Sequence, residues 1–212
     1  MLASLAASIP AQASSASKVK PFEVFRGSPP FQLFMPEPGD MLFADWFTSS
    51  RTEQRIGDVV AKLLGTSSPY GYSKDRWAYV DVGMNRGFQT LLPARLGYEV
   101  LAMEAMPSCV AQAYTTLSLN NLMQAVRVLN VGVARRDHGY LTVRTSDECN
   151  AGNSIVSAQP EAKAVGGTVS TQPEVAGTVP LRSLASLLSS VTKGVAVLKM
   201  DIEVRCACRT GA

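Results

Sequence analysis

A group of small and polar residues follows an apolar run near the middle of the chain. The stretch WAYVDVGMNRGFQTLL places Asp81 near the end of the run and then Gly83, Asn85 and Gly87 in a turn of pattern G-x-x-x-G. Gly83 lets the backbone turn sharply, and Gly87 lets a ligand approach the next helix without a Cβ in the way. An aspartate that ends an apolar strand is costly unless it faces a polar ligand or an amide donor. The turn is therefore a candidate ligand-binding site.

A second acidic residue, Glu104, ends the next apolar run. In doubly wound nucleotide-binding sheets, an acid about 20 residues beyond the first turn accepts hydrogen bonds from ribose hydroxyls. The turn and Glu104 together favour a ligand that contains adenosine.

The turn also discriminates among such ligands. It lacks the middle glycine of G-x-G-x-x-G, which a pyrophosphate needs for close approach, and Asp81 would repel the pyrophosphate charges. These two features disfavour a nicotinamide dinucleotide, and a P-loop is excluded because no G-K-[ST] follows. S-adenosylmethionine carries a sulfonium and an ammonium instead of phosphates, so an acid beside the turn favours it.

The elements that position these residues alternate between strands and helices. Residues 77–82, 98–104 and 125–133 are apolar runs that predict strands, and residues 87–97 and 107–121 between them predict helices, the second with Pro107 at its first position. This alternation implies right-handed crossovers and a mostly parallel sheet with helices on both faces. The predicted fold is a doubly wound, Rossmann-like α/β domain.

The second half of the sequence is less regular. Asp137 to Gly139 predicts a turn into a strand, and the only histidine, His138, is interpreted as a surface residue of that turn. Residues 145–177 predict a long loop with at most one short strand. Residues 180–191 space their leucines, beginning with Leu181, like a helix, and residues 194–203 predict a last strand.

Four segments are expected along the chain. Residues 1–20 form an Ala/Ser-rich leader that is either disordered or a weak targeting segment, and residues 21–66 form an extension with a proline-rich part and a helix over 44–65. Residues 67–203 form the α/β domain, and residues 204–212 are a divergent tail. The compartment stays open: cytoplasmic, or organellar or secretory if the leader is a targeting sequence.

Composition restricts the classes of partner. The 20 basic and 17 acidic residues are too evenly balanced to indicate nucleic acid, and no apolar run is long enough to span a membrane. No metal site is predicted. The four cysteines are interpreted as free thiols, because they show neither a disulfide framework nor the paired spacing of a zinc site. They are Cys109, Cys149, Cys206 and Cys208.

Several blocks in order resemble the FkbM-like family of S-adenosylmethionine-dependent methyltransferases. They are YVDVGMNRGFQTLL, VLAMEAMPSCVAQAYTTLSLNNL, RVLNVGVARRDHGYLTV, GTVPLRSLASLL and AVLKMDIE, and together they cover roughly residues 79–203. The departures include Pro93, which lies inside the helix after the turn and would remove one of its hydrogen bonds. The resemblance implies S-adenosylmethionine as cofactor and O-methylation of a sugar, lipid or small-metabolite hydroxyl.

The resemblance also implies roles for individual residues. Those implied to hold the cofactor are Asp81, Gly83, Asn85 and Gly87 around its methionine part and Glu104 at its ribose. Asp201 and Glu203 are implied as catalytic residues, and Lys199 belongs to the same signature. The family continues beyond this signature, so the chain is interpreted as an incomplete domain. The alternative is a non-catalytic remnant that serves as an interaction module.

Overall fold

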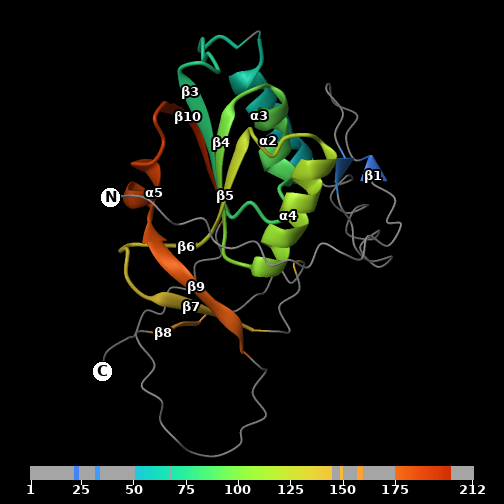
Figure 1. Ribbon diagram of the computed structural model, residues 1–212. Coiled ribbons are helices and arrows are strands. Elements are labelled where there is room, and N and C mark those ends of the chain that lie inside the picture. The colour runs from blue at the N-terminus through green and yellow to red at the C-terminus, as the bar shows by residue number, and fades with distance from the viewer. Residues whose placement is uncertain are drawn as a thin grey trace, which may run out of the picture.

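A computed structural model shows two four-stranded sheets, one parallel and one mixed, with helices packed against the parallel sheet (Figure 1). The structure describes residues 22–23, 32–33, 51–66, 68–144, 149, 157–159 and 175–201. The predicted doubly wound α/β fold is confirmed by the parallel sheet and by the placement of its helices.

The parallel sheet has the strand order β10-β3-β4-β5. Each of these strands falls within an apolar run from which a strand was predicted. Their bounds are Trp77–Val82 for β3, Glu99–Glu104 for β4, Val126–Asn130 for β5 and Gly194–Met200 for β10.

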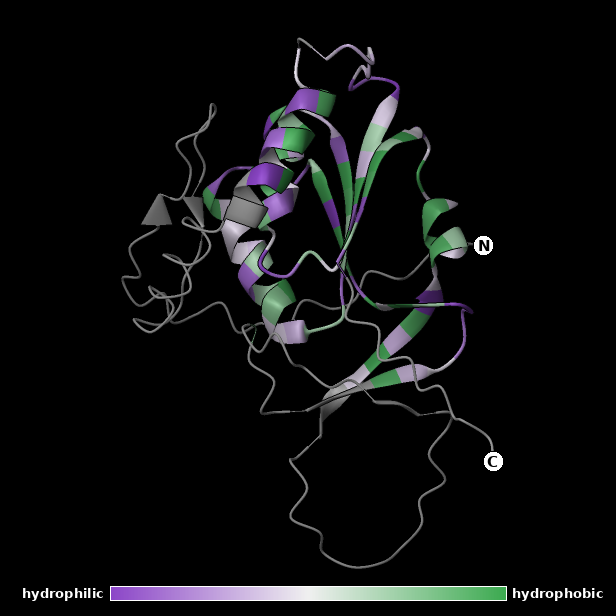
Figure 2. Ribbon diagram, turned by 180° about the vertical axis from the view of Figure 1, so that it is seen from behind, coloured by the Kyte–Doolittle hydropathy of each residue, from purple (hydrophilic) through white to green (hydrophobic). Residues whose placement is uncertain are grey.

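Helices cover the two faces of this sheet because alternate strand residues point to opposite sides. Tyr79 of β3 packs in one cluster with residues of α2, α3 and α4, whereas Val80 and Val82 pack in another with Leu187 of α5. Figure 2 shows hydrophobic residues in the central strands and in the helices around them. The helices are α2 (Arg51–Leu64), α3 (Phe88–Arg95), α4 (Pro107–Leu119) and α5 (Leu184–Leu188).

The helix after the turn is short and contains the proline noted in the sequence. Gly87 precedes α3 with φ 88°, a left-handed conformation that suits glycine. The helix passes through Pro93 and reaches Arg95, so the proline is accommodated two residues before the end of the helix. Pro107 is the first residue of α4, as predicted.

The strand order places a topological switch point between β3 and β10. From β3 the chain steps outward through β4 to β5, whereas β10 lies on the other side of β3. The helix before β10, α5, also packs on the opposite face from α3 and α4. In open α/β sheets, ligands bind outside the carboxyl ends of the strands at such a point. The fold therefore points to the ends of β3 and β10 as the functional region.

A second sheet of order β6-β9-β7-β8, which we did not predict from the sequence, lies beside the carboxyl ends of the first (Figure 1). β6 pairs parallel with β9, and β7 pairs antiparallel with both β9 and β8. The bounds are Gly132–Ala134 for β6, Tyr140–Arg144 for β7, Ser157–Gln159 for β8 and Val175–Ser183 for β9.

This second sheet corrects two predicted elements. The single strand expected over residues 125–133 is divided at Val131, whose N–H donates to the Glu104 carbonyl before the chain leaves for β6. The helix expected from residue 180 begins only at Leu184, because Leu181 pairs with Gly132 in the second sheet. Ser183 caps that helix, its Oγ accepting a hydrogen bond from a backbone N–H of the first turn.

The remaining described elements lie toward the N-terminus. β1 (Phe22–Glu23) and β2 (Gln32–Leu33) form an antiparallel pair, and α2 is the part of the predicted helix over 44–65 that the structure describes. Among the described residues, no helix combines the length and hydropathy needed to cross a membrane. The predicted leader and the predicted tail both lie outside the described residues.

Candidate functional site

The glycine-spaced turn lies at the switch point and is held by the neighbouring strand. The N–H groups of Gly83 and Met84 both donate to the Met103 carbonyl, at 2.9 and 3.0 Å. Three of the turn residues have positive φ, namely Gly83 at 76°, Asn85 at 55° and Gly87 at 88°. Asparagine is among the few side chains that tolerate this conformation. The sequence therefore specifies one backbone path at the carboxyl end of β3.

Gly83 is required by a close backbone approach as well as by its φ. A Cβ added to Gly83 would lie 2.0 Å from the carbonyl oxygen of Asp201, which follows directly after β10. Such a distance is far inside van der Waals contact, so only glycine allows the end of β10 to lie against the turn. The turn and the end of β10 can thus be in contact only because residue 83 has no side chain.

Asp81 lies beneath the turn instead of on its surface. Its side chain is fully buried and faces α3, where Thr90 Oγ1 donates a hydrogen bond of 2.7 Å to Oδ2. The other oxygen, Oδ1, lies 3.1 Å from Lys199 Nζ in an ion pair. Both carboxylate oxygens therefore have partners inside the protein.

Lys199 of β10 connects three groups at the switch point. Its Nζ donates a hydrogen bond of 2.7 Å to the Gly83 carbonyl and forms the ion pair with Asp81. It also lies 3.7 Å from Oδ2 of Asp201, whose side chain is 71% exposed. Lys199 thus compensates the buried charge of Asp81 and at the same time positions the turn beside Asp201.

Glu104 holds the turn from the neighbouring strand. Its Oε2 accepts a hydrogen bond of 2.9 Å from the Asn85 N–H, and its Oε1 accepts one of 2.8 Å from the Met106 N–H. Burial raises the pKa of Glu104 above the usual range, although these backbone donors and the charge of Lys199 oppose the shift. Glu104, which the sequence assigned to a ribose, thus contacts the turn directly through the Asn85 N–H.

A residue that we did not select from the sequence supports Glu104. Asn130 ends β5, and its Nδ2 donates to the carbonyls of Glu104 and Ala105 at 2.9 and 3.0 Å. These bonds fix the two peptide groups that directly follow the Glu104 Cα. No clear signal marked it in the sequence, because Asn130 lies inside the run of residues 125–133 from which a single strand was predicted.

The interpretation of all four cysteines as free thiols is wrong for two of them. Cys109 in the first turn of α4 forms a disulfide with Cys149, 40 residues later. The sulfurs lie beside the turn, because Asn85 Oδ1 is 3.4 Å from Cys149 Sγ and 3.9 Å from Cys109 Sγ. Only the fold brings the two cysteines together, since their spacing matches no local pattern. Cys206 and Cys208 lie outside the described residues.

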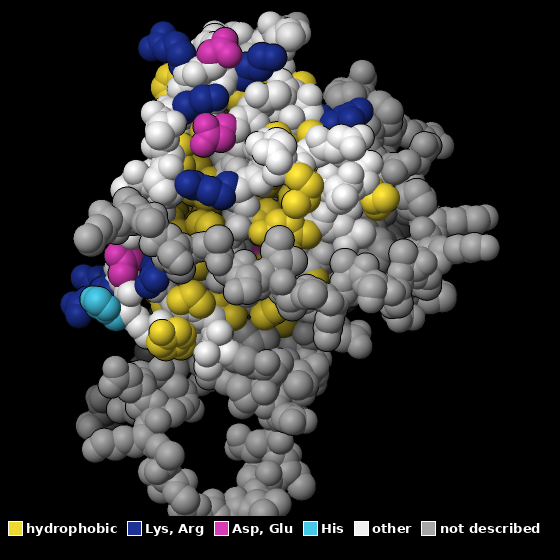
Figure 3. Space-filling model, viewed as in Figure 1, with side chains coloured by type: hydrophobic (Ala, Val, Ile, Leu, Met, Phe, Trp, Pro, Cys, Tyr) yellow, Lys and Arg dark blue, Asp and Glu magenta, His cyan; other side chains and the backbone are white. Residues whose placement is uncertain are grey.

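The remaining predicted residues are placed less centrally. Asp201 is exposed at the switch point, whereas Glu203 lies outside the described residues. His138 is exposed between β6 and β7, as predicted, and Figure 3 shows it among charged side chains on the molecular surface. No group of three His, Cys, Asp or Glu side chains that could hold a metal ion occurs within the described part of the chain.

Comparison with known proteins agrees with the geometry of this site. The family model described as the methyltransferase FkbM domain matches residues 81–203, from the buried aspartate beneath the turn to the last residue of the predicted signature. No curated protein and no solved structure matches the chain. The matched segment includes the turn, Glu104 and Lys199, and it covers more than half of the 212 residues. The chain therefore belongs to the FkbM methyltransferase domain family.

Proposed function

We propose that this protein binds S-adenosylmethionine at the turn and transfers its methyl group to a hydroxyl of a sugar, lipid or small metabolite. Membership of the family implies a methyl donor. The observation that carries the proposal is the turn at the switch point, where the Asn85 N–H is hydrogen-bonded to the Glu104 carboxylate. A donor without phosphates suits this turn, which has no middle glycine.

In this proposal Glu104 binds the ribose. Its carboxylate oxygens accept backbone N–H bonds that include those of Asn85 and Met106, and a carboxylate oxygen can accept more than one hydrogen bond. The two ribose hydroxyls are donors of the required kind. The backbone bonds hold the carboxylate in place before the ligand arrives, which reduces the entropy lost on binding.

Asp81 has a different role here from the one implied by the family resemblance. Because both of its oxygens have internal partners, we assign it to positioning Lys199 and the turn. The exposed acid at the switch point is Asp201, which therefore takes the position nearest to an acceptor. Asp201 would accept the proton of the attacking hydroxyl as a general base, and the resemblance assigns Glu203 to the same step. Bound S-adenosylmethionine supplies an electrophilic methyl group on its sulfonium.

Calorimetric titration with S-adenosylhomocysteine tests the proposal directly. We expect saturable binding heat from the folded protein, and no competing effect of NADH, because the turn disfavours a pyrophosphate. Circular dichroism before the titration establishes that the sample is folded. No heat at millimolar ligand would overturn the proposed cofactor.

The raised pKa of Glu104 predicts an unusual pH dependence of cofactor affinity. Protonation removes one acceptor for the ribose hydroxyls, so affinity falls as the pH drops through the raised pKa of Glu104. The decrease begins at a higher pH than for an exposed glutamate, whose pKa is about 4.3. Titrations between about pH 8 and pH 5 measure the affinity.

The free energy of unfolding depends on pH in the opposite sense. A carboxyl group whose pKa is raised in the folded state contributes stability at low pH, and this contribution is lost as the pH rises through the raised pKa.

Two variants isolate the contribution of Glu104 to this pH profile. Glu104→Gln should bind more weakly at neutral pH and show a flat profile, because the titrating group is gone. Glu99→Gln is the matched control, since Glu99 begins the same strand and its side chain is 41% exposed. It should keep the wild-type profile. An unchanged slope in Glu104→Gln would assign the pH dependence to another group.

A further inference from the structure

We propose that the Cys109–Cys149 disulfide is a reversible redox site that controls cofactor binding at the turn. The inference rests on the proposed function, because the controlled ligand is S-adenosylmethionine. The disulfide is neither distant from the turn nor exposed. Both cysteines are 3% exposed, and they pack with Met106, Leu141 and Val179 between α4 and the second sheet.

The contact that couples the disulfide to the turn is made by the Asn85 side chain. Its Oδ1 accepts a hydrogen bond of 2.7 Å from the Arg86 N–H, which holds the side chain against its own backbone. The same oxygen lies 3.4 Å from Cys149 Sγ and 3.9 Å from Cys109 Sγ. The sulfurs of a disulfide carry no hydrogen and cannot donate a hydrogen bond. In the oxidised state the Arg86 N–H therefore has no competition from a thiol donor for Asn85 Oδ1.

Reduction changes the hydrogen-bonding chemistry at this contact. Two S–H groups replace the S–S bond, and either thiol is then a donor within reach of Asn85 Oδ1. Such a bond competes with the Arg86 N–H. Reduction also removes the covalent link that holds Cys149 against the first turn of α4. Both changes act on Asn85, whose φ of 55° is tolerated by asparagine but is less favourable than an ordinary negative φ.

The effect reaches the cofactor site through backbone donors of Glu104, first of all that of Asn85. The Asn85 N–H donates to Glu104 Oε2, the carboxylate that we assign to the ribose. A shift of Asn85 therefore changes the orientation of Glu104 without any rearrangement of the sheet. The Met106 N–H, which donates to the other oxygen of Glu104, belongs to the residue before α4, three positions from Cys109. The disulfide thus lies close to two of the backbone donors of Glu104.

The proposed step is thiol–disulfide exchange with a dithiol reductant. A reductant thiolate attacks one sulfur, the other leaves as a thiolate and takes up a proton, and a mixed disulfide forms. The second reductant thiol then displaces the remaining protein sulfur. Two electrons and two protons reach the protein, and the reductant becomes a disulfide. Because the sulfurs are buried, attack requires local opening around Cys149.

Thermodynamic linkage makes the proposal quantitative. We expect reduction to weaken S-adenosylhomocysteine binding about tenfold, a typical coupling between two sites. The ligand must then stabilise the oxidised form by the same factor, which lowers the midpoint potential by about 30 mV for a two-electron couple. The ligand should also slow reduction, since it holds the turn against which Cys149 packs.

The experiment compares the full chain in its oxidised and reduced states. Peptide mapping first identifies the Cys109–Cys149 linkage, and calorimetry with S-adenosylhomocysteine gives the affinity of each state. Cys109→Ser/Cys149→Ser introduces hydroxyl donors in place of the thiols, whereas Cys109→Ala/Cys149→Ala removes the link without adding donors. Cys206→Ser/Cys208→Ser is the control for the other thiols and should retain the full redox response.

Each outcome decides the proposal. Weaker binding after reduction and in the serine variant, with a ligand-dependent midpoint potential, supports it. A smaller loss in the alanine variant would assign most of the coupling to the thiol donors, and an equal loss would assign it to the covalent link. Equal affinity of the two redox states, or a failure of the linkage to form under oxidant, overturns the redox inference and leaves the proposed function standing. No binding in either state overturns the proposed function itself.

Discussion

Substitution of Gly83 by alanine is expected to abolish binding of S-adenosylhomocysteine and to lower the free energy of unfolding by about 3 kcal/mol. Two penalties combine at this residue. An alanine at φ 76° is strained, and its Cβ would lie 2.0 Å from the Asp201 carbonyl oxygen, a backbone atom that cannot rotate away. The end of β10 and the turn must therefore separate, which also displaces the Gly83 carbonyl from Lys199 Nζ.

Gly71→Ala is the matched control for this prediction. Gly71 also has positive φ, at 61°, but an added Cβ would have no atom within 4 Å. Alanine there carries only the conformational penalty, about 1 kcal/mol, and leaves ligand binding intact. Urea denaturation gives both free energies, and calorimetry gives both affinities. Similar losses of stability in the two variants would mean that the contact with Asp201 does not constrain Gly83.

The elements of the parallel sheet could be predicted because they depend on local signals. The strands β3 and β4 are apolar runs with an acid at or next to their last residue, and Pro107 marks the start of α4. Those signals lie within short stretches of consecutive residues, so the elements can be predicted without knowledge of the fold. The same holds for the turn, since the spacing of Gly83 and Gly87 already restricts its backbone.

The second sheet and the site's internal partners could not be predicted in this way. Leu181 fits the helical spacing of the residues after it, but its pairing with Gly132 places it in a strand. The disulfide joins cysteines that pack in one cluster with Leu141 of β7 and Val179 of β9, so their proximity depends on the second sheet. These features depend on tertiary pairing, which overrides local propensity.

The role of Asp81 illustrates the limit most clearly. Its position near the end of an apolar strand indicated a ligand contact or an internal donor, and the family resemblance implied a contact with the cofactor. The structure shows that both partners are internal: Thr90 belongs to α3, and Lys199 belongs to β10, which lies more than 100 residues later in the chain. A polar residue in a strand thus indicates that a partner exists, whereas the identity of the partner depends on the topology.

Lys199→Met is expected to lower the free energy of unfolding by about 3–5 kcal/mol, because it leaves the buried carboxylate of Asp81 without its cation. Methionine keeps much of the length of the side chain, so the loss reports the charge and the hydrogen bond to Gly83 more than the packing. Asp81 is fully buried, so water cannot replace the lost partner. The affinity for S-adenosylhomocysteine should fall as well, since the Gly83 carbonyl in the turn loses its hydrogen bond from Lys199.

The second charge substitution distinguishes a buried ion pair from general loss of structure. In Asp81→Asn/Lys199→Met the buried group is a neutral amide, whose oxygen can still accept the hydrogen bond from Thr90. The double variant should therefore be more stable than Lys199→Met alone, although the bond to the Gly83 carbonyl remains absent. Such recovery is a coupling between the two sites, which a double-mutant cycle by urea denaturation measures.

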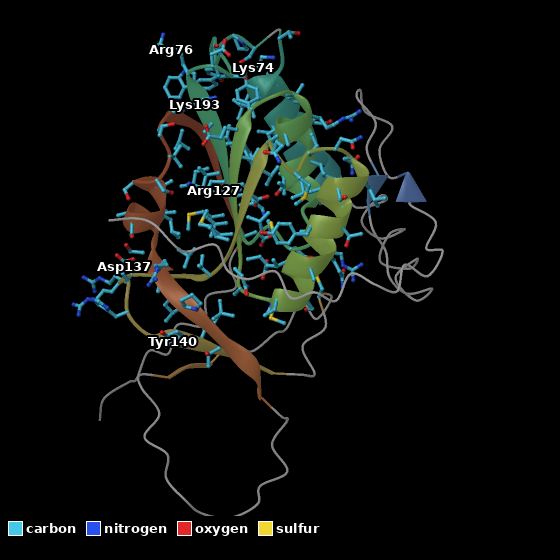
Figure 4. All side chains as sticks on the ribbon, viewed as in Figure 1. Lys74, Arg76, Arg127, Asp137, Tyr140 and Lys193 are labelled. Carbon is cyan, nitrogen blue, oxygen red and sulfur yellow. A yellow bond between two sulfur atoms is a disulfide. The ribbon has the colours of Figure 1, made fainter. Side chains whose placement is uncertain are left out.

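Lys193→Met supplies the control for the loss of a lysine in the same part of the chain. Lys193 directly precedes β10 and lies with Lys74 and Arg76 at the amino end of the parallel sheet, away from the turn (Figure 4). Its ion pair with Glu99 spans 3.8 Å between side chains that are 28% and 41% exposed, so its loss should cost less than about 1 kcal/mol. If Lys193→Met and Lys199→Met lose equal stability, or if the double variant is no more stable than Lys199→Met, the buried pair is not what holds the turn. If instead only Lys199→Met is affected and Asp81→Asn restores much of its stability, the loss comes from the unpaired buried charge of Asp81, which Lys199 compensates beneath the turn.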